Sequence, residues 1–542
     1  MKDNVMDAGE EAFEGNADLE SHLGWETFRS LASSWKSETV VDCTSDPRSF
    51  NAGAILVLST LLADRLGAAT SRNRVGIVLP PGIGVIVSNL ASVFCGKSPV
   101  NLNFSLGREA LEASIERAEI DLVLTSDVVK KRLPDFPWTE RILDVGVELK
   151  GFSKLKLGLR AMLLASLPTG LAASWLGIPR KGGREEAALL FTSGSSGLPK
   201  GVVLSHRNVL ANCAQIRATE LIPQGETLLG NLPIFHSFGF TVSLWFCLIE
   251  GVRLVTVPSP LDIRGSLKAI REQGVTALLG TPTFLRPYLR RAKEGDLDSI
   301  NFVIAGAEKT PEGFAEKWEQ EANCVYLEGY GLTETSPVLC ANLTGEEDGI
   351  PRRRPGAVGR LLPGLAARVV DPDSGEVQSP DTTGILHFRG PNVFEGYLGE
   401  PEKTAEVLLE DGWFETGDLG FFDEDGFLRI EGRLSRFSKI GGEMVPHGRM
   451  EEAVIEVLGL DDGDRPVVAV AGRSDPAKGE ALVLLTTVEI DSKELFKLLS
   501  EKGLSNLWIP KEIKRVDEIP LLPTGKLDLK AITDLAVSAG SD

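Results

Sequence analysis

Apolar and polar positions along the first part of the chain predict helices and strands in alternation. Helical spacing of apolar residues covers 54–66 and ends at Gly67, whereas short apolar stretches at 75–79 and 122–125 predict strands. Strands that alternate with helices are typical of an α/β fold with a largely parallel sheet. The same mixed pattern continues to about residue 430. We therefore expect one large α/β domain with mostly parallel sheets.

After Gly432 the pattern predicts a smaller, compact α+β unit. Its expected elements are helices at 450–458 and 492–502 and strands at 467–471 and 481–488. A chain of 542 residues is long enough for two or more domains, because a single core rarely grows past about 250–300 residues. The expected division is a leader at 1–24, a large domain at 25–432 and a small domain at 433–542.

The net charge narrows the classes of partner. The chain has 57 Lys and Arg against 77 Asp and Glu, a balance of −20, which argues against a protein that coats nucleic acid. The first twenty residues carry one Lys against seven acids, and we expect them to be solvated and without fixed structure. They lack the basic start and apolar stretch of a signal peptide. Six scattered Cys without a CxxC pair indicate reduced thiols, so we expect a cytoplasmic protein.

One segment, 150–184, reverses the acidic balance with seven Lys and Arg and no acid. Its apolar residues Phe152, Leu155, Leu159 and Met162 follow helical spacing. Such a segment either lies on the anionic inner face of a membrane or is an ordinary surface helix with solvated lysines. Neither this segment nor any other apolar run approaches the roughly 20 residues needed to span a bilayer.

The sequence from Thr192 to Lys200 predicts a phosphate-binding loop. An apolar approach at 187–191 leads into Thr-Ser-Gly-Ser-Ser-Gly-Leu-Pro-Lys. Glycines let backbone N–H groups curl around an anion, and hydroxyls with an ammonium add further donors. The spacing differs from that of a Walker A loop. We interpret the loop as a cradle for a polyphosphate.

With this loop the chain resembles the adenylate-forming superfamily of acyl-CoA synthetases, luciferases and peptide-synthetase adenylation domains. Three further motifs follow in the order found in that family. They are Glu-Gly-Tyr-Gly-Leu-Thr-Glu at 328–334, Trp-Phe-Glu-Thr-Gly-Asp at 413–418 continuing to Gly-Arg at 432–433, and Pro-Thr-Gly-Lys at 523–526. The resemblance covers roughly 25–535, and four ordered motifs are far more specific than any one of them.

Within the superfamily the chain is most similar to the acyl-acyl-carrier-protein synthetase part of the bifunctional 2-acylglycerophosphoethanolamine acyltransferase, and to long-chain acyl-CoA synthetases. The stretches that carry this similarity are 232–239, 303–309, 436–445 and 478–484. The acyltransferase half of that family has a His-x4-Asp motif, and no His of this chain has Asp at that spacing. A separate lysophospholipid acyltransferase is therefore one expected partner.

The resemblance implies a two-step ligation that uses ATP and Mg²⁺. A fatty acid carboxylate attacks the α-phosphorus to give acyl-AMP and pyrophosphate, and a thiol then displaces AMP. Acyl-carrier protein is the favoured thiol and CoA the alternative. From another class, the chain could be a nucleotide-binding protein with an inactive site. Because carrier proteins are acidic like this chain, their docking requires local basic clusters, such as Arg352–Arg354 or Arg433, Arg436 and Lys439.

The resemblance also implies a role for each residue of the nucleotide site. The phosphates are expected to contact Thr192, Ser193, Gly194, Ser195, Ser196, Gly197 and Lys200. The adenine is expected between Tyr330, with its neighbours Gly329 and Gly331, and the segment Gly306, Ala307 and Glu308. Thr333 is expected at the α-phosphate, Glu334 at Mg²⁺, Asp418 at the ribose hydroxyls and Arg433 beside them.

The remaining expected roles concern catalysis and the second step. Lys526 is expected to bridge the substrate carboxylate and the α-phosphate. The hinge of the small domain falls at Ser435, where relatives commonly carry Asp or Lys. After the domain swings, Lys439, Gly441 and Gly442 are expected to face the thiol. His236 is a candidate gate between thiol and acyl pockets, with a buried core histidine as the alternative. The acyl pocket is expected at Phe238, Phe240, Leu244 and Gly280.

Overall fold

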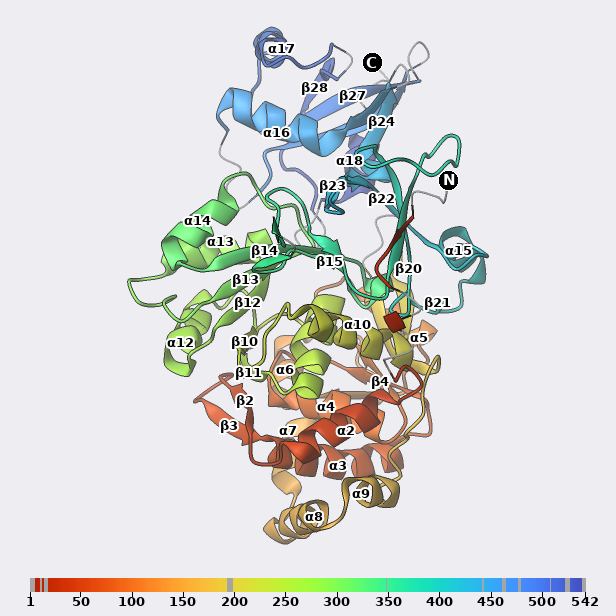
Figure 1. The fold of residues 1–542 in the computed structure, drawn as a ribbon, viewed down its shortest axis with the longest axis vertical. Helices are drawn as coiled ribbons and strands as arrows, with labels where there is room; N and C mark the ends of the chain where they lie inside the picture. Colours follow the sequence, from red (N-terminus) through yellow and green to blue (C-terminus); the bar gives the residue numbers. More distant parts are fainter. Residues whose placement is uncertain are drawn as a thin grey trace.

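The computed structural model describes residues 5–9, 12–13, 18–192, 198–347, 349–440, 443–460, 465–475, 479–506, 508–521 and 527–538. They form an elongated molecule with a large part below and a small part above, and the two ends of the chain lie near the upper end in the view of Figure 1. The expected α/β class with a small second domain is confirmed.

A nine-stranded sheet forms the centre of the large part. Its order is β18-β15-β14-β13-β12-β10-β11-β2-β3. The six inner strands from β14 to β2 are parallel to their neighbours, and antiparallel strands close both edges. In this order the strands are Arg360–Leu361, Val338–Ala341, Val325–Gly331, Phe302–Ala305, Ala277–Gly280, Thr227–Gly230, Arg253–Thr256, Glu38–Asp42 and Arg48–Asn51.

Both faces of this sheet are buried, because neighbouring apolar residues of a strand point to opposite sides. Leu228 of β10 belongs to the main core, whereas the next residue, Leu229, belongs to a second core on the other face. Three helices build that second core, namely α12 (Ile263–Gln273), α13 (Pro282–Arg291) and α14 (Phe314–Ala322). This burial on two sides explains why the strands are nearly continuous apolar runs.

A second parallel sheet, β5-β4-β6-β7, lies at the N-terminal end of the large part. Its strands are Ser98–Asn101, Arg74–Ile77, Leu122–Thr125 and Arg141–Asp144. The surrounding helices are α2 (Leu23–Ser33), α3 (Ala52–Ala69), α4 (Ile83–Phe94), α5 (Arg108–Arg117), α6 (Asp127–Arg132), α7 (Val145–Gly151), α8 (Lys154–Ser166), α9 (Thr169–Trp175) and α10 (His206–Thr219). The strands expected at 75–79 and 122–125 and the helix expected at 54–66 are confirmed.

Helix α3 is the one described helix that is long and apolar enough to cross a bilayer, with 18 residues and a mean hydropathy of 1.5. Asp64 and Arg65 interrupt its apolar run, so the expectation that no uninterrupted apolar run reaches about 20 residues holds for this helix. In addition, 61% of the helix is buried inside the protein, and it packs against α2, α4 and α8. Its apolar surface thus belongs to the core.

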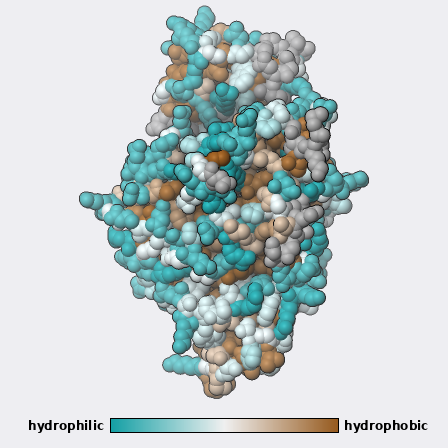
Figure 2. Space-filling view, viewed as in Figure 1, coloured by the Kyte–Doolittle hydropathy of each residue, from teal (hydrophilic) through white to brown (hydrophobic). Residues whose placement is uncertain are grey.

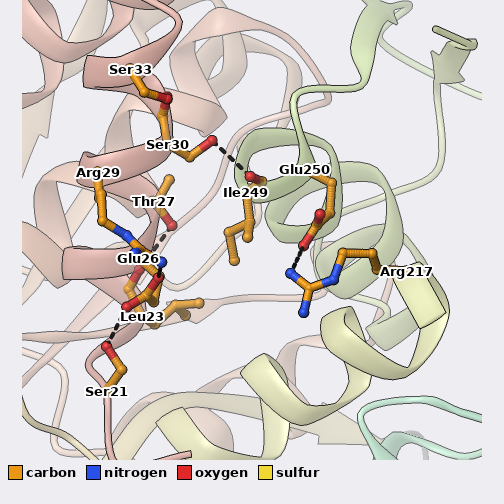
Figure 3. A network of polar contacts seen from close by, with 10 residues as sticks. All are labelled: Ser21, Leu23, Glu26, Thr27, Arg29, Ser30, Ser33, Arg217, Ile249 and Glu250. Atoms are coloured by element: carbon orange, nitrogen blue, oxygen red, sulfur yellow. Dashed lines mark hydrogen bonds and ion pairs between the residues drawn. The ribbon is translucent and has the colours of Figure 1, made fainter. Parts of the chain in front are cut away.

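Helix α2 is tied to the centre of the large part by polar contacts at both of its ends (Figure 3). Ser30 donates to the carbonyl of Ile249 at 2.7 Å, on α11 (Cys247–Glu250). The next residue of α11, Glu250, pairs with Arg217 of α10 at 3.1 Å. Near the start of the helix, the Ser21 hydroxyl donates to Glu26 at 2.6 Å. The first two contacts link α2 to α11 and α11 to α10.

Two antiparallel sheets link the large part to the small one. The first, β21-β9-β8, consists of Gly396–Tyr397, Lys200–Ser205 and Glu186–Thr192. The second, β1-β19-β20-β22-β23, consists of Met6–Asp7, Ala366–Val370, Gly384–Arg389, Phe414–Phe422 and Leu428–Arg433. The remaining elements of the large part are β16 (Glu346–Glu347), β17 (Ile350–Pro351), α15 (Pro401–Val407), the π-helix η1 (Phe238–Phe246) and the 3₁₀ turn η2 (Thr333–Thr335).

The leader was expected to have no fixed structure, but two of its described residues form a strand. Met6 and Asp7 form strand β1, which pairs with Ala367 and Ala366 of β19 and appears in red beside that sheet in Figure 1. The half-buried Met6 packs against the main core. Backbone hydrogen bonds to an edge strand thus fix residues that the acidic composition suggested would be free.

The small domain follows the 3₁₀ turn η3 (Leu434–Arg436) and has its own cores on both sides of one sheet. The sheet joins β25, β24, β27 and β26, and β28 pairs with β27. The strands are Glu443–Pro446, Phe437–Ile440, Gly479–Thr486, Val468–Asp475 and Glu512–Arg515. The helices are α16 (His447–Leu458), α17 (Ser492–Glu501) and α18 (Leu529–Val537). The two helices and two strands expected after Gly432 are confirmed.

Candidate active site

The carboxyl ends of β13 and β14 form a slot that is built from backbone. These strands are parallel, with Ala305 opposite Glu328, so the segment Gly306, Ala307 and Glu308 runs beside Gly329 and Tyr330. A Cβ added to Gly306 would stand 3.3 Å from the Gly329 carbonyl oxygen. A Cβ on Gly331 would stand 2.0 Å from the Pro337 carbonyl oxygen. The chain passes so closely here that only glycine fits at Gly331.

Tyr330 joins this slot to a different sheet. Its hydroxyl donates to Asp418 of β22 at 2.5 Å, and Arg433, directly opposite Asp418 on β23, pairs with the same carboxylate at 3.0 Å. Burial and the nearby Asp418 raise the pKa of the Tyr330 phenol well above its usual value. Asp418 raises the pKa of Arg433. The phenol is therefore a fixed donor, and Asp418 is a buried carboxylate with two partners.

Tyr397 joins the phosphate-loop lysine to the expected metal ligand. Its hydroxyl donates to the Glu334 carboxylate at 2.9 Å, while the Lys200 ammonium lies 4.6 Å from the centre of its ring. A cation over an aromatic face is attracted by the ring electrons. Lys200 pairs in register with Thr192, so both ends of the loop sit on the hairpin of β8 and β9. Burial and Glu334 raise the pKa of the Tyr397 phenol.

A family model and several known proteins are similar to this chain in sequence. The model described as AMP-binding enzyme matches residues 53–398. The chain belongs to the AMP-binding enzyme family. The long-chain-fatty-acid–CoA ligase of Bacillus subtilis (strain 168) is 28% identical over 483 residues, which cover 84% of each chain. The protein of that name from Escherichia coli O157:H7 is 31% identical over 357 residues, 65% of this chain and 62% of the relative.

Solved structures show the same fold. An o-succinylbenzoate CoA synthetase (MenE) from Bacillus subtilis, in complex with the acyl-adenylate intermediate, superposes with a TM-score of 0.76 at 20% identity. The match covers 94% of this chain and 97% of that one. ATP-bound MatB from Rhodopseudomonas palustris superposes with a TM-score of 0.74 at 24% identity over 94% and 98% of the two chains. The large and small domains of this AMP-binding enzyme thus have structural counterparts.

The residues of the site fit ATP and Mg²⁺. Gly329 and Gly331 flank Tyr330 with backbone rather than side chains, and buried Asp418 offers carboxylate oxygens to hydroxyl donors. Glu334 offers a hard oxygen ligand, and the Thr333 hydroxyl lies on the same turn. The described residues hold no group of three or more His, Cys, Asp or Glu that could bind a metal. This fits Mg²⁺, which takes one or two carboxylates and otherwise binds phosphates and water.

The segment around His236 adjoins the same turn. The Ser237 hydroxyl lies 3.3 Å from the Thr333 hydroxyl. His236 itself is exposed, with its ring 4.7 Å from that of Phe235, so the alternative of a buried core histidine is wrong. Phe238 approaches Gly306, because a Cβ there would meet its ring at 3.9 Å. These contacts place His236 and Phe238 close to the nucleotide slot.

The residues expected to form the acyl pocket divide into two groups. Phe238 is half-buried beside the slot, whereas Phe240 and Leu244 of η1 are fully buried in the main core. Gly280 is covered by Leu285, which would stand 2.9 Å from an added Cβ. A narrow apolar hollow lies nearby, lined among others by Leu229, Leu278 and Phe284. In this conformation Phe240 and Leu244 are core residues.

The described residues expected to serve the second step, Ser435 and Lys439, follow the end of β23. Ser435 is exposed in η3, between the end of β23 and the start of β24. The Lys439 ammonium pairs with Asp373, on the loop between β19 and β20, at 2.7 Å. Five of the seven expected loop residues, Ser193 to Gly197, together with Gly441, Gly442 and Lys526, lie outside the described residues, so their roles stay predictions.

Sequence reasoning missed Tyr397. It lies about 60 residues from Glu334 and about 200 from Lys200, and it reaches them because β21 pairs with β9 next to the loop. The available signal was an aromatic pair, Phe394 and Tyr397, between two glycines and just before the motif at 413–418. Phe394 also fixes this turn, since its N–H donates to the Glu334 carbonyl at 2.8 Å.

Proposed function

We propose that this AMP-binding enzyme activates long-chain fatty acids as acyl-AMP and transfers the acyl group to a thiol. The observation that carries the proposal is the pairing of Lys200 and Glu334 on one tyrosine, because phosphoryl chemistry requires a cation and a metal ligand at the same place. The relatives named long-chain-fatty-acid–CoA ligase support the substrate class.

The proposed first step forms a bond between a carboxylate oxygen and the α-phosphorus of ATP while the bond to pyrophosphate breaks. Two anions must approach each other, so the site has to supply positive charge where they meet. Lys200 lies at the loop that leads to the phosphates, and Lys526 is the expected second cation. Bound Mg²⁺ would offset the charge of the phosphate oxygens and orient them. Asp418 and Tyr330 would hold the nucleoside so that the α-phosphate lies next to these cations.

In the proposed second step a thiol sulfur attacks the acyl carbon, the bond to AMP oxygen breaks, and the thiol proton is released. CoA is the acceptor that we favour. Arg352 donates to the Thr219 carbonyl at 3.3 Å. The other residues expected to dock an acidic carrier protein are already ion-paired: Arg353 with Glu319, Arg354 with Asp423 and Asp425, Arg433 with Asp418, Arg436 with Glu451 and Lys439 with Asp373. Their positive charge is largely offset within the chain, and this argues against carrier docking there.

Acyl-carrier protein remains the second candidate because the stretch 436–445 resembles the carrier-linked synthetases. Purified enzyme given ATP, Mg²⁺, a labelled long-chain fatty acid and equal concentrations of CoA and carrier protein decides between them. We expect predominant acyl-CoA. Predominant acyl-carrier protein would overturn the choice of acceptor, and the absence of both thioesters together with the absence of acyl-AMP would overturn the ligase proposal.

A further inference from the structure

Helices α8 and α9 expose an unusual amount of apolar surface. Seven of the thirteen large hydrophobic residues that are exposed in the described chain fall between 147 and 175. Leu155, Leu159 and Met162 of α8 are 71, 53 and 62% exposed. Leu171 and Trp175 of α9 are 61 and 59% exposed. Scattered single apolar residues need no explanation, but a cluster of this size marks an interaction surface.

The geometry of α8 gives it two apolar faces. At 3.6 residues per turn, Leu155, Leu159 and Met162 lie on one side, one turn after another. Leu157 and Leu164 lie on the opposite side, where they pack against the main core. The inward face is therefore sufficient to hold the helix on the protein, and the outward row has no packing role in the fold.

Helix α9 continues the outward row. Leu171 and Trp175 are four residues apart and lie on one face, while Ala172 and Ala173 are buried on the other. The guanidinium of Arg160 lies 5.5 Å from the centre of the Trp175 ring and also pairs with Asp64 of α3. These contacts tie α9, α8 and α3 together, so the exposed side chains are presented by a fixed support.

Positive charge borders the outward row. Lys154 and Lys156 project on either side of it, and Lys150 precedes the helix; all three are exposed and have no carboxylate partner within the described part of the chain. The acids nearest this surface are engaged elsewhere: Asp64 with Arg160, and Glu148 with Arg65 at 3.4 Å. The chain has a net charge of −20, but the N-terminal end of α8 is thus a local cationic patch.

The position of the patch suits a flat partner. The helices α8 and α9 form the lower tip of the molecule, at the opposite end from the small domain (Figure 1), and pale and brown side chains gather at that tip in Figure 2. A 13-residue helix is about 20 Å long, too short to cross a bilayer but long enough to lie along its surface. A convex apolar row bordered by lysines, with a tryptophan, is typical of segments that lie at the membrane interface.

We propose that the outer face of α8 and α9 docks this protein on anionic lipid bilayers. Leu155, Leu159, Met162, Leu171 and Trp175 enter the boundary between headgroups and acyl chains, and Lys150, Lys154 and Lys156 contact the anionic headgroups. The proposal is independent of the ligase activity, because it rests on the surface alone. Long-chain fatty acids partition into bilayers, so docking would also bring such a substrate close to the enzyme.

Co-sedimentation with vesicles tests the proposal. The full chain is mixed with vesicles of phosphatidylglycerol and phosphatidylcholine, and with phosphatidylcholine alone, in 0.1 M salt. We expect binding to the anionic vesicles. The triple variant Lys150→Gln/Lys154→Gln/Lys156→Gln should bind about 100-fold more weakly, at about fivefold per lysine. The variant Leu155→Ser/Leu159→Ser/Met162→Ser should lose at least about tenfold.

A matched control comes from α17, which carries exposed Lys493, Phe496 and Lys497 on a helix of the small domain. The variant Lys493→Gln/Phe496→Ser/Lys497→Gln removes two charges and one apolar side chain from an exposed helix and should bind vesicles within about twofold of the wild type. Thermal unfolding of all variants checks that they are folded. Equal loss in the control, no loss in either α8 variant, or no binding by the wild type overturns the proposal.

Fluorescence tests the orientation of the surface. Vesicles with brominated acyl chains quench tryptophans that enter the membrane, and the chain has eight tryptophans. The quenched part of the emission should disappear in Trp175→Phe. Unchanged quenching in that variant would overturn the orientation. Binding of the same lysines to an acidic protein, with no affinity for vesicles, would show that the partner is a protein and would also overturn the proposal.

Discussion

The contacts of the nucleotide site differ from those that hold the small domain. Asp418 is buried, takes two partners and sits on a strand ladder that fixes both Asp418 and Arg433. The small domain contacts the large one through two ion pairs, Lys439 with Asp373 at 2.7 Å and Lys309 with Glu452 at 2.6 Å, whose side chains are at least 48% exposed. Phe437 of the small domain also packs against Ile385 and Leu419 of the large one. One set is centred on a buried carboxylate whose partner Arg433 is 55% exposed, and the other combines exposed ion pairs with a small apolar contact.

The difference indicates which part of the enzyme is rigid. Removing the Asp418 carboxylate leaves the half-buried Tyr330 hydroxyl without its acceptor at about 1–3 kcal/mol, whereas an exposed ion pair contributes about 0–1 kcal/mol. The nucleotide half of the site is therefore fixed before substrate binds. The two exposed ion pairs add little to holding the small domain in its present position, and a swing about Ser435 stays a prediction.

The largest expected effect comes from Lys526. Lys526→Ala should slow acyl-AMP formation by about 10³-fold, because a cation aimed at developing charge is worth that much, while ATP binding stays nearly unchanged. Single-turnover acyl-AMP formation and ATP titration measure the two quantities. Equal losses in both would contradict the catalytic role, and Lys530→Ala, on the neighbouring helix α18, serves as the matched control.

Asp418→Ala should have the next largest effect. It removes the acceptor of Tyr330 and the partner of Arg433, so we expect kcat/KM for ATP to fall about 100-fold, or about 3 kcal/mol. Asp373→Ala removes a carboxylate from an exposed ion pair and should leave the same constant within about twofold. Steady-state kinetics with ATP as the varied substrate compare the two. Similar losses in both variants would show that the nucleotide site and the interface between the domains do not differ in this respect.

Acid should weaken the large domain through two adjacent buried histidines. His22 and His206 are buried with ring centres 3.8 Å apart, and burial lowers their pKa values to about 4 and about 3. Since these pKa values lie below the unfolded value of 6.5, the unfolded state takes up more protons. Stability is then complete above about pH 6.5 and falls as the pH drops towards the folded values, by about 2 kcal/mol per ring at pH 5.

The His206→Asn variant measures this contribution. Asparagine can still accept the Leu23 N–H bond that His206 Nδ1 now accepts at 3.1 Å, but it does not titrate. Urea unfolding at pH 7.5 and pH 5 should show about 2 kcal/mol less pH dependence in this variant than in the wild type. His236→Asn, at an exposed position, provides the control. An unchanged pH dependence in His206→Asn would show that burial of this ring does not control acid stability.

Tyr397→Phe tests the hydrogen bond from Tyr397 to Glu334, and its expected effect is smaller. The ring that faces Lys200 is kept and the hydrogen bond to Glu334 is lost, so we expect about a tenfold drop in acyl-AMP formation. Tyr397→Leu should cost more, because it also removes the cation–π contact. If both variants match the wild type in single-turnover assays, Tyr397 has a packing role only.

The smallest effect is expected at the interface between the domains. The double variant Asp373→Ala/Glu452→Ala breaks both exposed ion pairs and should change stability by less than about 1 kcal/mol and each half-reaction by less than about threefold. Thermal unfolding and separate assays of the two half-reactions measure this. A loss of several kcal/mol would show that the small domain is fixed as firmly as the nucleotide site.

Local elements were predictable where local pattern and burial agree. Strand β6 (Leu122–Thr125) matches its apolar run residue for residue. Helix α3 begins at an Asn51 cap but runs past Gly67, because packing against α2, α4 and α8 outweighs the cost of about 1 kcal/mol for one glycine. The strand β1 was not predictable, since its stability comes from the distant edge of β19.

The sequence predicted only those residues of the site that lie in recognisable motifs. The sequence identified Tyr330, Asp418 and Arg433 separately, and the sheets bring them into one network. Tyr397 and the Lys439–Asp373 pair depend on strand pairing and domain placement, which leave no local signature. The positive charge of 150–184 can be read from the sequence. That one apolar face of α8 packs on the core while the other is exposed follows only from the fold.

The central claim is that this enzyme joins a long-chain fatty acid to AMP. Exchange of labelled pyrophosphate into ATP, measured without any thiol, reports that step directly. We predict exchange that requires both a long-chain fatty acid and Mg²⁺ and that falls about 100-fold in Asp418→Ala. No exchange with any fatty acid, by enzyme that still binds ATP, would contradict the account.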